Sequence, residues 1–173
     1  TTNATYNNDI AGIGRDDLSC LEQKQSTSQN TGSIVTMGLG TVAASNAANP
    51  NSFADDGDFL IWGDDGVDAS QANANTTDVP GNVTERMQRI WKVQDTGNTG
   101  ATTIQFDLTG LGYGSNVSDF QLIVSNSSTM SAGSLYPAAS LVGNILTFNN
   151  IDLTDGQFFT IGTDRTACGP GGV

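Results

Sequence analysis

The residues of this sequence that could do chemistry are chiefly carboxylates, and a third of them crowd into one short stretch. Six of the 18 acidic residues lie within 14 positions, with no basic residue among them: Asp55, Asp56, Asp58, Asp64, Asp65 and Asp68. Hard cations such as calcium bind several converging carboxylate and carbonyl oxygens. If this stretch binds calcium, we expect Asp58, Asp64 and Asp65 to be the ligands. We favour the alternative, a solvated acidic hairpin whose charges prevent a sheet edge from pairing with another chain.

Catalytic chemistry is less well supported than cation binding. Paired carboxylates can hydrolyse glycosides, but their separation in space does not follow from their spacing along the chain. The chain contains no histidine, so it lacks the commonest general base and metal ligand. Trp62 and Trp91 are expected in the core rather than beside a cleft. We therefore expect no enzyme, with a glycoside-acting enzyme as the remote alternative, and no cofactor other than calcium.

The two cysteines, Cys20 and Cys168, lie near opposite ends of the chain. Neither has a second cysteine at a spacing that would suit a zinc site. A disulfide between them would close almost the whole domain, which the chain-entropy model values at about 4–5 kcal/mol. Because disulfides persist in exported proteins, we predict this bridge. The alternatives are two unpaired thiols, or a Cys168 that pairs outside this sequence.

The charge balance and the length of the apolar runs exclude two classes of partner. Six Lys and Arg residues against 18 Asp and Glu residues leave a net charge of −12, which opposes binding to nucleic acid phosphates. The longest strongly apolar run, 59–62, is far shorter than the roughly 20 residues that span a bilayer, so we expect no membrane insertion. Three of the scarce basic residues, Arg86, Arg89 and Lys92, are expected to pair with the acidic loops.

The elements that must position these residues are strands, because apolar and polar residues alternate repeatedly with period two. The clearest case is 103–108, where Ile104, Phe106 and Leu108 face one way. Further strands are expected at 10–15, 34–39, 59–62, 86–94, 120–124, 145–148 and 158–161. The apolar run 59–62 predicts a strand covered on both sides, and 86–94 a single strand with Trp91 and Val93 on one face.

Turn residues separate these runs, and two longer polar loops are expected at 43–52 and 64–82. About eight or nine short strands with frequent turns predict an all-β fold, a single antiparallel β-sandwich of the jelly-roll or immunoglobulin-like kind. We expect one module over residues 1–168, with 169–173 as the start of a linker.

Several segments carry a resemblance to a known family. They are 6–17 (YNNDIAGIGRDD), 21–25 (LEQKQ), 35–40 (VTMGLG), 59–63 (FLIWG) and 89–97 (RIWKVQDTG). The chain resembles, over roughly residues 6–125, a module that follows laminin-G/concanavalin-like domains in large secreted adhesin-like surface proteins of Bacteroidetes-type bacteria. The cysteine pair is a departure from that family.

The resemblance implies a non-catalytic structural or adhesive module of a large extracellular, cell-surface protein or filament. Its partners would be neighbouring modules of the same protein, together with cell-surface glycans or other cells. The alternative is a carbohydrate-binding module, for which Tyr6, Tyr113 and Tyr136 are the available aromatic side chains. Burial of Trp62 and Trp91 would favour the scaffold, whereas an exposed pair beside a groove would favour sugar binding.

Overall fold

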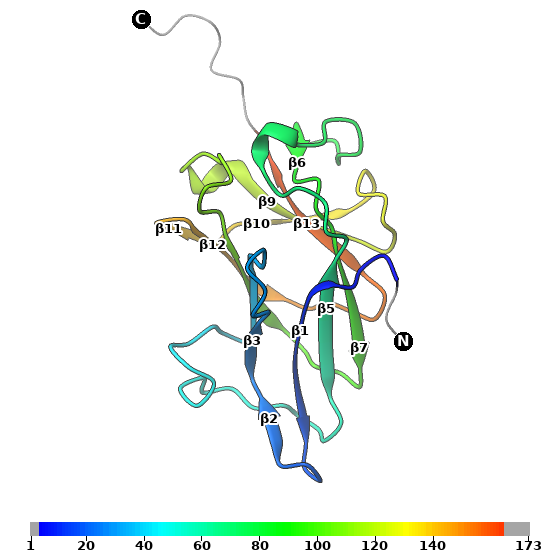
Figure 1. The fold of residues 1–173 in the computed structure, drawn as a ribbon, viewed down its shortest axis with the longest axis vertical. Helices are drawn as coiled ribbons and strands as arrows, with labels where there is room; N and C mark the ends of the chain where they lie inside the picture. The colour runs from blue at the N-terminus through cyan, green and yellow to red at the C-terminus, as the bar shows by residue number, and fades with distance from the viewer. Residues whose placement is uncertain (1–3, 165–173) are drawn as a thin grey trace, which may run out of the picture.

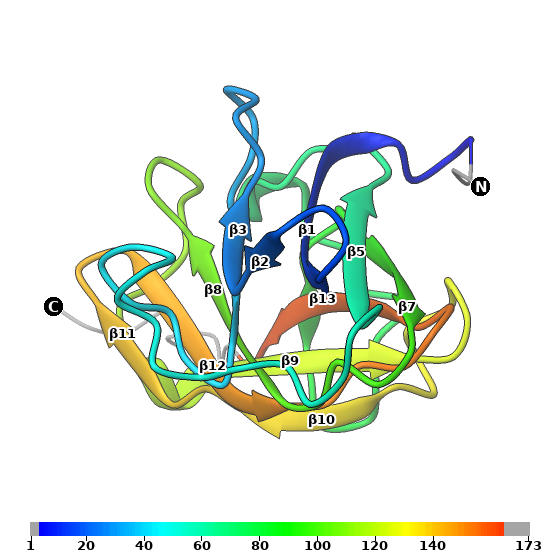
Figure 2. The ribbon, with the colours of Figure 1, turned by 90° about the horizontal axis from the view of Figure 1, so that it is seen from below.

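The computed structural model describes residues 4–164, which form two antiparallel β-sheets packed face to face (Figures 1 and 2). The large sheet has the order β10-β9-β13-β7-β5-β1-β2, with β6 beside β13, and the small sheet has the order β11-β12-β8-β4-β3. The large sheet consists of β1 (Asn8–Asp16), β2 (Leu21–Gln23), β5 (Phe59–Asp64), β6 (Glu85–Arg86), β7 (Trp91–Thr96), β9 (Phe120–Ser125), β10 (Ser134–Pro137) and β13 (Phe158–Thr163). The small sheet consists of β3 (Gln25–Thr27), β4 (Val35–Leu39), β8 (Thr102–Asp107), β11 (Ser140–Val142) and β12 (Ile145–Ile151).

The predicted all-β sandwich is confirmed, but residues 4–164 contain 13 strands rather than eight or nine. The additional strands, β2, β3, β6, β10 and β11, are two to four residues long. A strand this short does not contain enough residues for alternation to show. The described part of the chain also has two 3-10 turns, η1 (Gln71–Asn73) and η2 (Val117–Asp119). No helix among residues 4–164 is long and apolar enough to cross a membrane.

Two of the predicted strands differ from expectation. The run 59–62 forms part of β5, but it is not covered on both sides, because Ile61 is 41% exposed while Leu60 and Trp62 are buried. The stretch 86–94 is not one strand. Arg86 belongs to β6, which pairs with the end of β13, and β7 begins only at Trp91.

An aromatic cluster holds the two sheets together. Trp91 stacks on Phe159, with ring centroids 5.6 Å apart, and contacts the Phe106 ring edge-on at 5.4 Å. Phe106 in turn meets Phe148 of the small sheet edge-on at 6.0 Å. Such pairs add about 0.5–1.5 kcal/mol to the burial of their area. Trp62 is also in this core, and each tryptophan is 1% exposed.

Continuous segments close both edges of the sandwich by passing from one sheet to the other. Lys24 alone separates β2 of the large sheet from β3 of the small sheet. On the other side, Ala138 and Ala139 separate β10 from β11. Figure 2 shows β2 and β3 meeting at one of these corners. Because exposed edge strands are templates for pairing with other chains, short edges that bend away at corners limit such pairing.

The polar loop 43–52, as predicted, has no strand, and it buttresses the corner at Lys24. The buried amide of Asn49 donates to the carbonyls of Leu39 (3.2 Å) and Thr41 (2.7 Å). Its carbonyl oxygen accepts the N–H of Asn51. The ammonium of Lys24 donates to the main-chain carbonyl of Asn49 at 2.7 Å. The loop thereby satisfies main-chain groups that the change of sheet leaves without ladder partners.

We predict that Asn49→Asp lowers the free energy of unfolding by about 2–3 kcal/mol, because a buried carboxylate would face carbonyl oxygens that need a donor. Equilibrium unfolding in urea measures the change. Asn30→Asp, which adds the same charge at an exposed loop position, should have little effect. Equal losses from the two substitutions would contradict the role given to Asn49.

Candidate functional site

The six clustered acids do not form one site, because β5 separates them into two groups. Asp55, Asp56 and Asp58 precede this strand, whereas the other three occupy its last residue and the loop that follows. At about 3.3 Å per residue, the six residues from Asp58 to Asp64 place these two roughly 20 Å apart. Asp58 therefore cannot share a cation with Asp64 and Asp65, contrary to the predicted ligand set. Among residues 4–164, no three Asp, Glu, Cys or His side chains are grouped so that they could hold a metal ion.

The favoured alternative, a solvated acidic hairpin, is wrong for Asp58 and Asp64, which are 3% and 0% exposed. Asp58 joins two loops, because its carboxylate accepts the N–H of Asp55 at 3.1 Å and that of Asn98 at 3.0 Å. Gly97 adjoins this carboxylate so closely, at a φ of +81°, that a Cβ would lie 2.2 Å from Oδ1. The side chain of Asp58 thus holds the loop that precedes β5 against the turn that follows β7.

Asp64 belongs to a buried cluster with Asp9 and Arg89. One Arg89 nitrogen, Nη1, lies 3.4 Å from Asp9 Oδ2 and 3.8 Å from Asp64 Oδ2. Asp64 Oδ1 accepts the Gly66 N–H at 2.7 Å, but Oδ2 has no hydrogen-bond donor within residues 4–164. Asp9 adopts a left-handed φ of +48°, at the register shift between β1 and β5. One guanidinium therefore serves two carboxylates in a buried place.

The electrostatics of this cluster follow from its burial. Burial raises the pKa of the Asp64 carboxyl to about 6, and the neighbouring Asp9 adds to this rise. The Gly66 N–H and the charge of Arg89 act in the opposite direction but do not cancel it. A neutral Asp64 is thus stabilised in mildly acidic solution.

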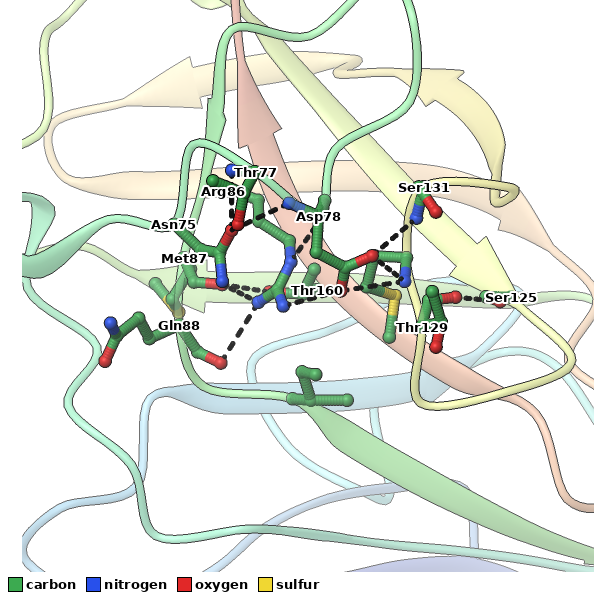
Figure 3. Close-up of polar contacts among 12 residues, drawn as sticks. Asn75, Thr77, Asp78, Arg86, Met87, Gln88, Ser125, Thr129, Ser131 and Thr160 are labelled. Atoms are coloured by element: carbon green, nitrogen blue, oxygen red, sulfur yellow. Dashed lines mark hydrogen bonds and ion pairs between the residues drawn. The ribbon is translucent and has the colours of Figure 1, made fainter.

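A second ion pair, between Arg86 and Asp78, lies where the long loop after β5 meets the loop between β9 and β10, as Figure 3 shows. Arg86 is 5% exposed, and its Nη2 donates to Asp78 Oδ2 at 2.8 Å. The same carboxylate accepts the N–H of Met130 at 2.9 Å and of Ser131 at 2.9 Å. Partial burial tends to raise the pKa of Asp78, but the donors from Met130, Arg86 and Ser131 outweigh it and hold this pKa below its usual value.

Arg89 contacts Asp64 of the clustered acids, whereas Arg86 pairs with Asp78, which is not one of them. Sequence reasoning predicted that both arginines pair with the acidic loops, and this is confirmed for Arg89. It missed Asp78 itself, because that residue lies 52 positions from Met130 and no local pattern links the two. Lys92 does not pair as predicted. Its ammonium lies over the Phe158 ring, 5.2 Å from the centroid, and the ion pairs of residues 4–164 do not include it.

The outer face of the large sheet carries a shallow pocket of about 290 Å³. The side chains that line it come from four segments and include Tyr6, Ile10, Ile61, Lys92, Gln94 and Asp155. Of the three tyrosines predicted as free, Tyr6 alone is among these lining residues. Tyr136 is 37% exposed at the sheet edge, and Tyr113 is half-buried with its hydroxyl enclosed.

The predicted disulfide cannot be followed in the structure, since Cys168 lies outside the described residues. Cys20 is exposed in the turn between β1 and β2, at the bottom of Figure 1, whereas β13 ends at the top. The pairing stays a prediction. We expect thiol labelling of denatured, unreduced protein to leave both cysteines unlabelled, and labelling of both would contradict the bridge.

Fold and contacts together define an all-β sandwich domain whose acidic side chains are built into the loops that cover its ends. The chain belongs to the family described as Domain of unknown function (DUF8202), whose model matches residues 1–157. No curated protein and no solved structure matches the chain.

The raised pKa of Asp64 predicts a pH dependence of stability. Between about pH 4 and pH 6 the folded chain holds a proton on Asp64 that the unfolded chain has released. The free energy of unfolding should therefore fall as pH rises through this window, by at most about 3 kcal/mol. The contribution of Asp78 has the opposite sign and is lost below about pH 4.

Urea unfolding at fixed ionic strength across this pH range measures the slope. Asp64→Asn should flatten it, because the titrating group is gone. Asp107→Asn, at an exposed position on β8, should leave the slope as it is. An unchanged slope in Asp64→Asn would show that another group is responsible.

Proposed function

We propose that this chain is a non-catalytic structural or adhesive module of a large extracellular bacterial surface protein. The observation that carries the proposal is that the acidic side chains act as acceptors for loop N–H groups. Asp65 accepts from Val67 at 3.1 Å and from Ile90 at 3.3 Å, and Asp68 accepts from Ser70 at 2.8 Å. Carboxylates used in this way order the long loop after β5 through hydrogen bonds to its main chain. Ordered loops on a rigid sandwich suit the display of a surface to a partner.

Two further features support this role. Trp62 and Trp91 are buried in the core, the arrangement that favours a scaffold over an aromatic sugar platform. Both sandwich edges bend into corners, and the net charge of −12 opposes contact between copies. A chain of such modules would be joined through its ends rather than through its sheets.

A second candidate, a carbohydrate-binding module, is favoured by the pocket on the outer face of the large sheet. The pocket combines an aromatic ring with polar side chains. This function is a special case of the adhesive role, because a module that holds a glycan also attaches its parent protein to whatever carries that glycan.

Attachment without turnover is the property to test. Beads coated with the folded chain should attach saturably to cells or to their surface polysaccharide, and beads coated with heat-unfolded chain should not. The polysaccharide recovered afterwards should have an unchanged mass profile. Shortened chains in that profile would contradict a non-catalytic module and favour a glycoside-acting enzyme.

The purified chain should also sediment as a monomer in dilute buffer, because closed edges and high net charge disfavour association. Analytical ultracentrifugation over a wide range of protein concentration measures this. Stable filaments would instead make the chain a polymerising subunit, contrary to the proposal.

A further inference from the structure

The pocket on the large sheet lies over its central strands rather than at an edge. Its base includes the cross-strand pair of Ile61 on β5 and Gln94 on β7, together with Lys92 two residues before Gln94. Lys92 is paired in turn with Phe158 of β13, beside the pocket. A peptide that extends a sheet needs a free edge with unpaired main-chain groups. The strands here are paired on both sides, so this place does not suit a peptide strand.

The N-terminal segment forms one wall of the pocket by crossing the sheet. At Gly63 a Cβ would lie only 2.6 Å from the carbonyl oxygen of Tyr6, so the chain passes directly over this glycine. The Tyr6 ring then packs edge-on against Phe158, with centroids 5.3 Å apart. This wall therefore contacts both β5 and β13, and these contacts fix the position of the Tyr6 ring.

The opposite wall is the turn before β13, which is also fixed. The N–H of Gly156 donates to the carbonyl of Val93 at 3.1 Å, and Asp155 Oδ1 accepts the N–H of Asp95 at 3.2 Å. Asp155 nevertheless stays exposed, which leaves its carboxylate available to a bound molecule. Both walls are thus in place before any ligand arrives, which spares the cost of ordering them.

The lining groups combine apolar surface with both donors and acceptors. Ile10 and Ile61 are 44% and 41% exposed, and they provide the apolar floor. Gln94 is exposed, and no hydrogen bond within residues 4–164 engages its amide. Lys92 supplies only donors, Asp155 only acceptors, and Gln94 supplies both.

From these groups we propose that the pocket binds a neutral sugar ring, one or two units at the end of a glycan. A pyranose has apolar C–H faces and a rim of hydroxyls that donate and accept, and these match the floor and rim just described. A hydrocarbon would remove water from Lys92, Gln94 and Asp155 without replacing their hydrogen bonds. An anionic ligand would meet Asp155 and a chain of net charge −12. The volume is at the lower end for small-molecule sites, which limits the ligand to a short unit.

This inference deepens the proposed adhesive role and rests on it. A titration of the folded chain followed by two-dimensional ¹H–¹⁵N NMR tests it directly. The probes are methyl glycosides of glucose, mannose, galactose and N-acetylglucosamine, with N-acetylneuraminic acid as the anionic comparison. At least one neutral sugar should cause saturable shifts of the main-chain amides of Ile61, Gln94 and Gly156.

Matched variants show whether those shifts come from the pocket. Gln94→Ala and Asp155→Asn should each weaken the binding about tenfold. The first removes the amide from the sugar rim, and the second replaces a charged acceptor oxygen by a neutral donor. Gln105→Ala, on the small sheet, and Asp152→Asn, an exposed position three residues from Asp155, should bind as the unmodified chain does. Thermal unfolding confirms that all four variants are folded.

Three results would overturn the inference: no saturable shift with any neutral sugar, binding confined to N-acetylneuraminic acid, or shifts that Gln94→Ala and Asp155→Asn leave unchanged. Failure here is distinguishable from failure of the adhesive role. Attachment of coated beads to cells without a saturable shift from any neutral sugar would retain the adhesive module and reject this pocket as its site.

Discussion

The buried ion pair between Arg86 and Asp78 is the contact on which the outer side of the large sheet depends (Figure 3). A guanidinium that is 5% exposed needs acceptors for its donors, and they are Asp78 and two nearby main-chain carbonyls. Removal of one partner from a buried pair leaves an uncompensated charge, which costs about 3–5 kcal/mol. The loop that contains Asp78, and the loop of Met130 that donates to it, are therefore held on the sheet.

What these two loops cover is a second apolar cluster outside the main core. Val83, Ile90, Ile123 and Met130 are buried there, and Phe158 and Tyr6 pack against its margin. The pocket begins where this cover ends, so Tyr6 contributes both to the cluster and to the pocket wall. The ion pair, the outer cluster and the pocket are thus consecutive parts of one arrangement on the same face.

The acidity of the chain has a structural use as well as a repulsive one. Carboxylates such as Asp58, Asp65 and Asp78 accept N–H groups in loops that no strand ladder satisfies. Amides do the same at the sheet-switching corner, where Asn49 is buried. The scarcity of charged residues, 14% of the chain, and the abundance of short polar ones both suit a fold with long loops and few helices.

Local residue patterns by themselves predicted segments of the eight longer strands and the inward placement of residues such as Ile104 and Phe106, because alternation and short apolar runs are properties of adjacent residues. They could not determine the short corner strands, or the split of 86–94, where tertiary pairing decides. They also could not predict that Asp64 contacts Arg89, 25 positions away, or that Asp78 accepts from Met130, 52 positions away. Only the tertiary structure brings such residues together, because contacts between distant segments depend on sheet order and register, which adjacent residues do not encode.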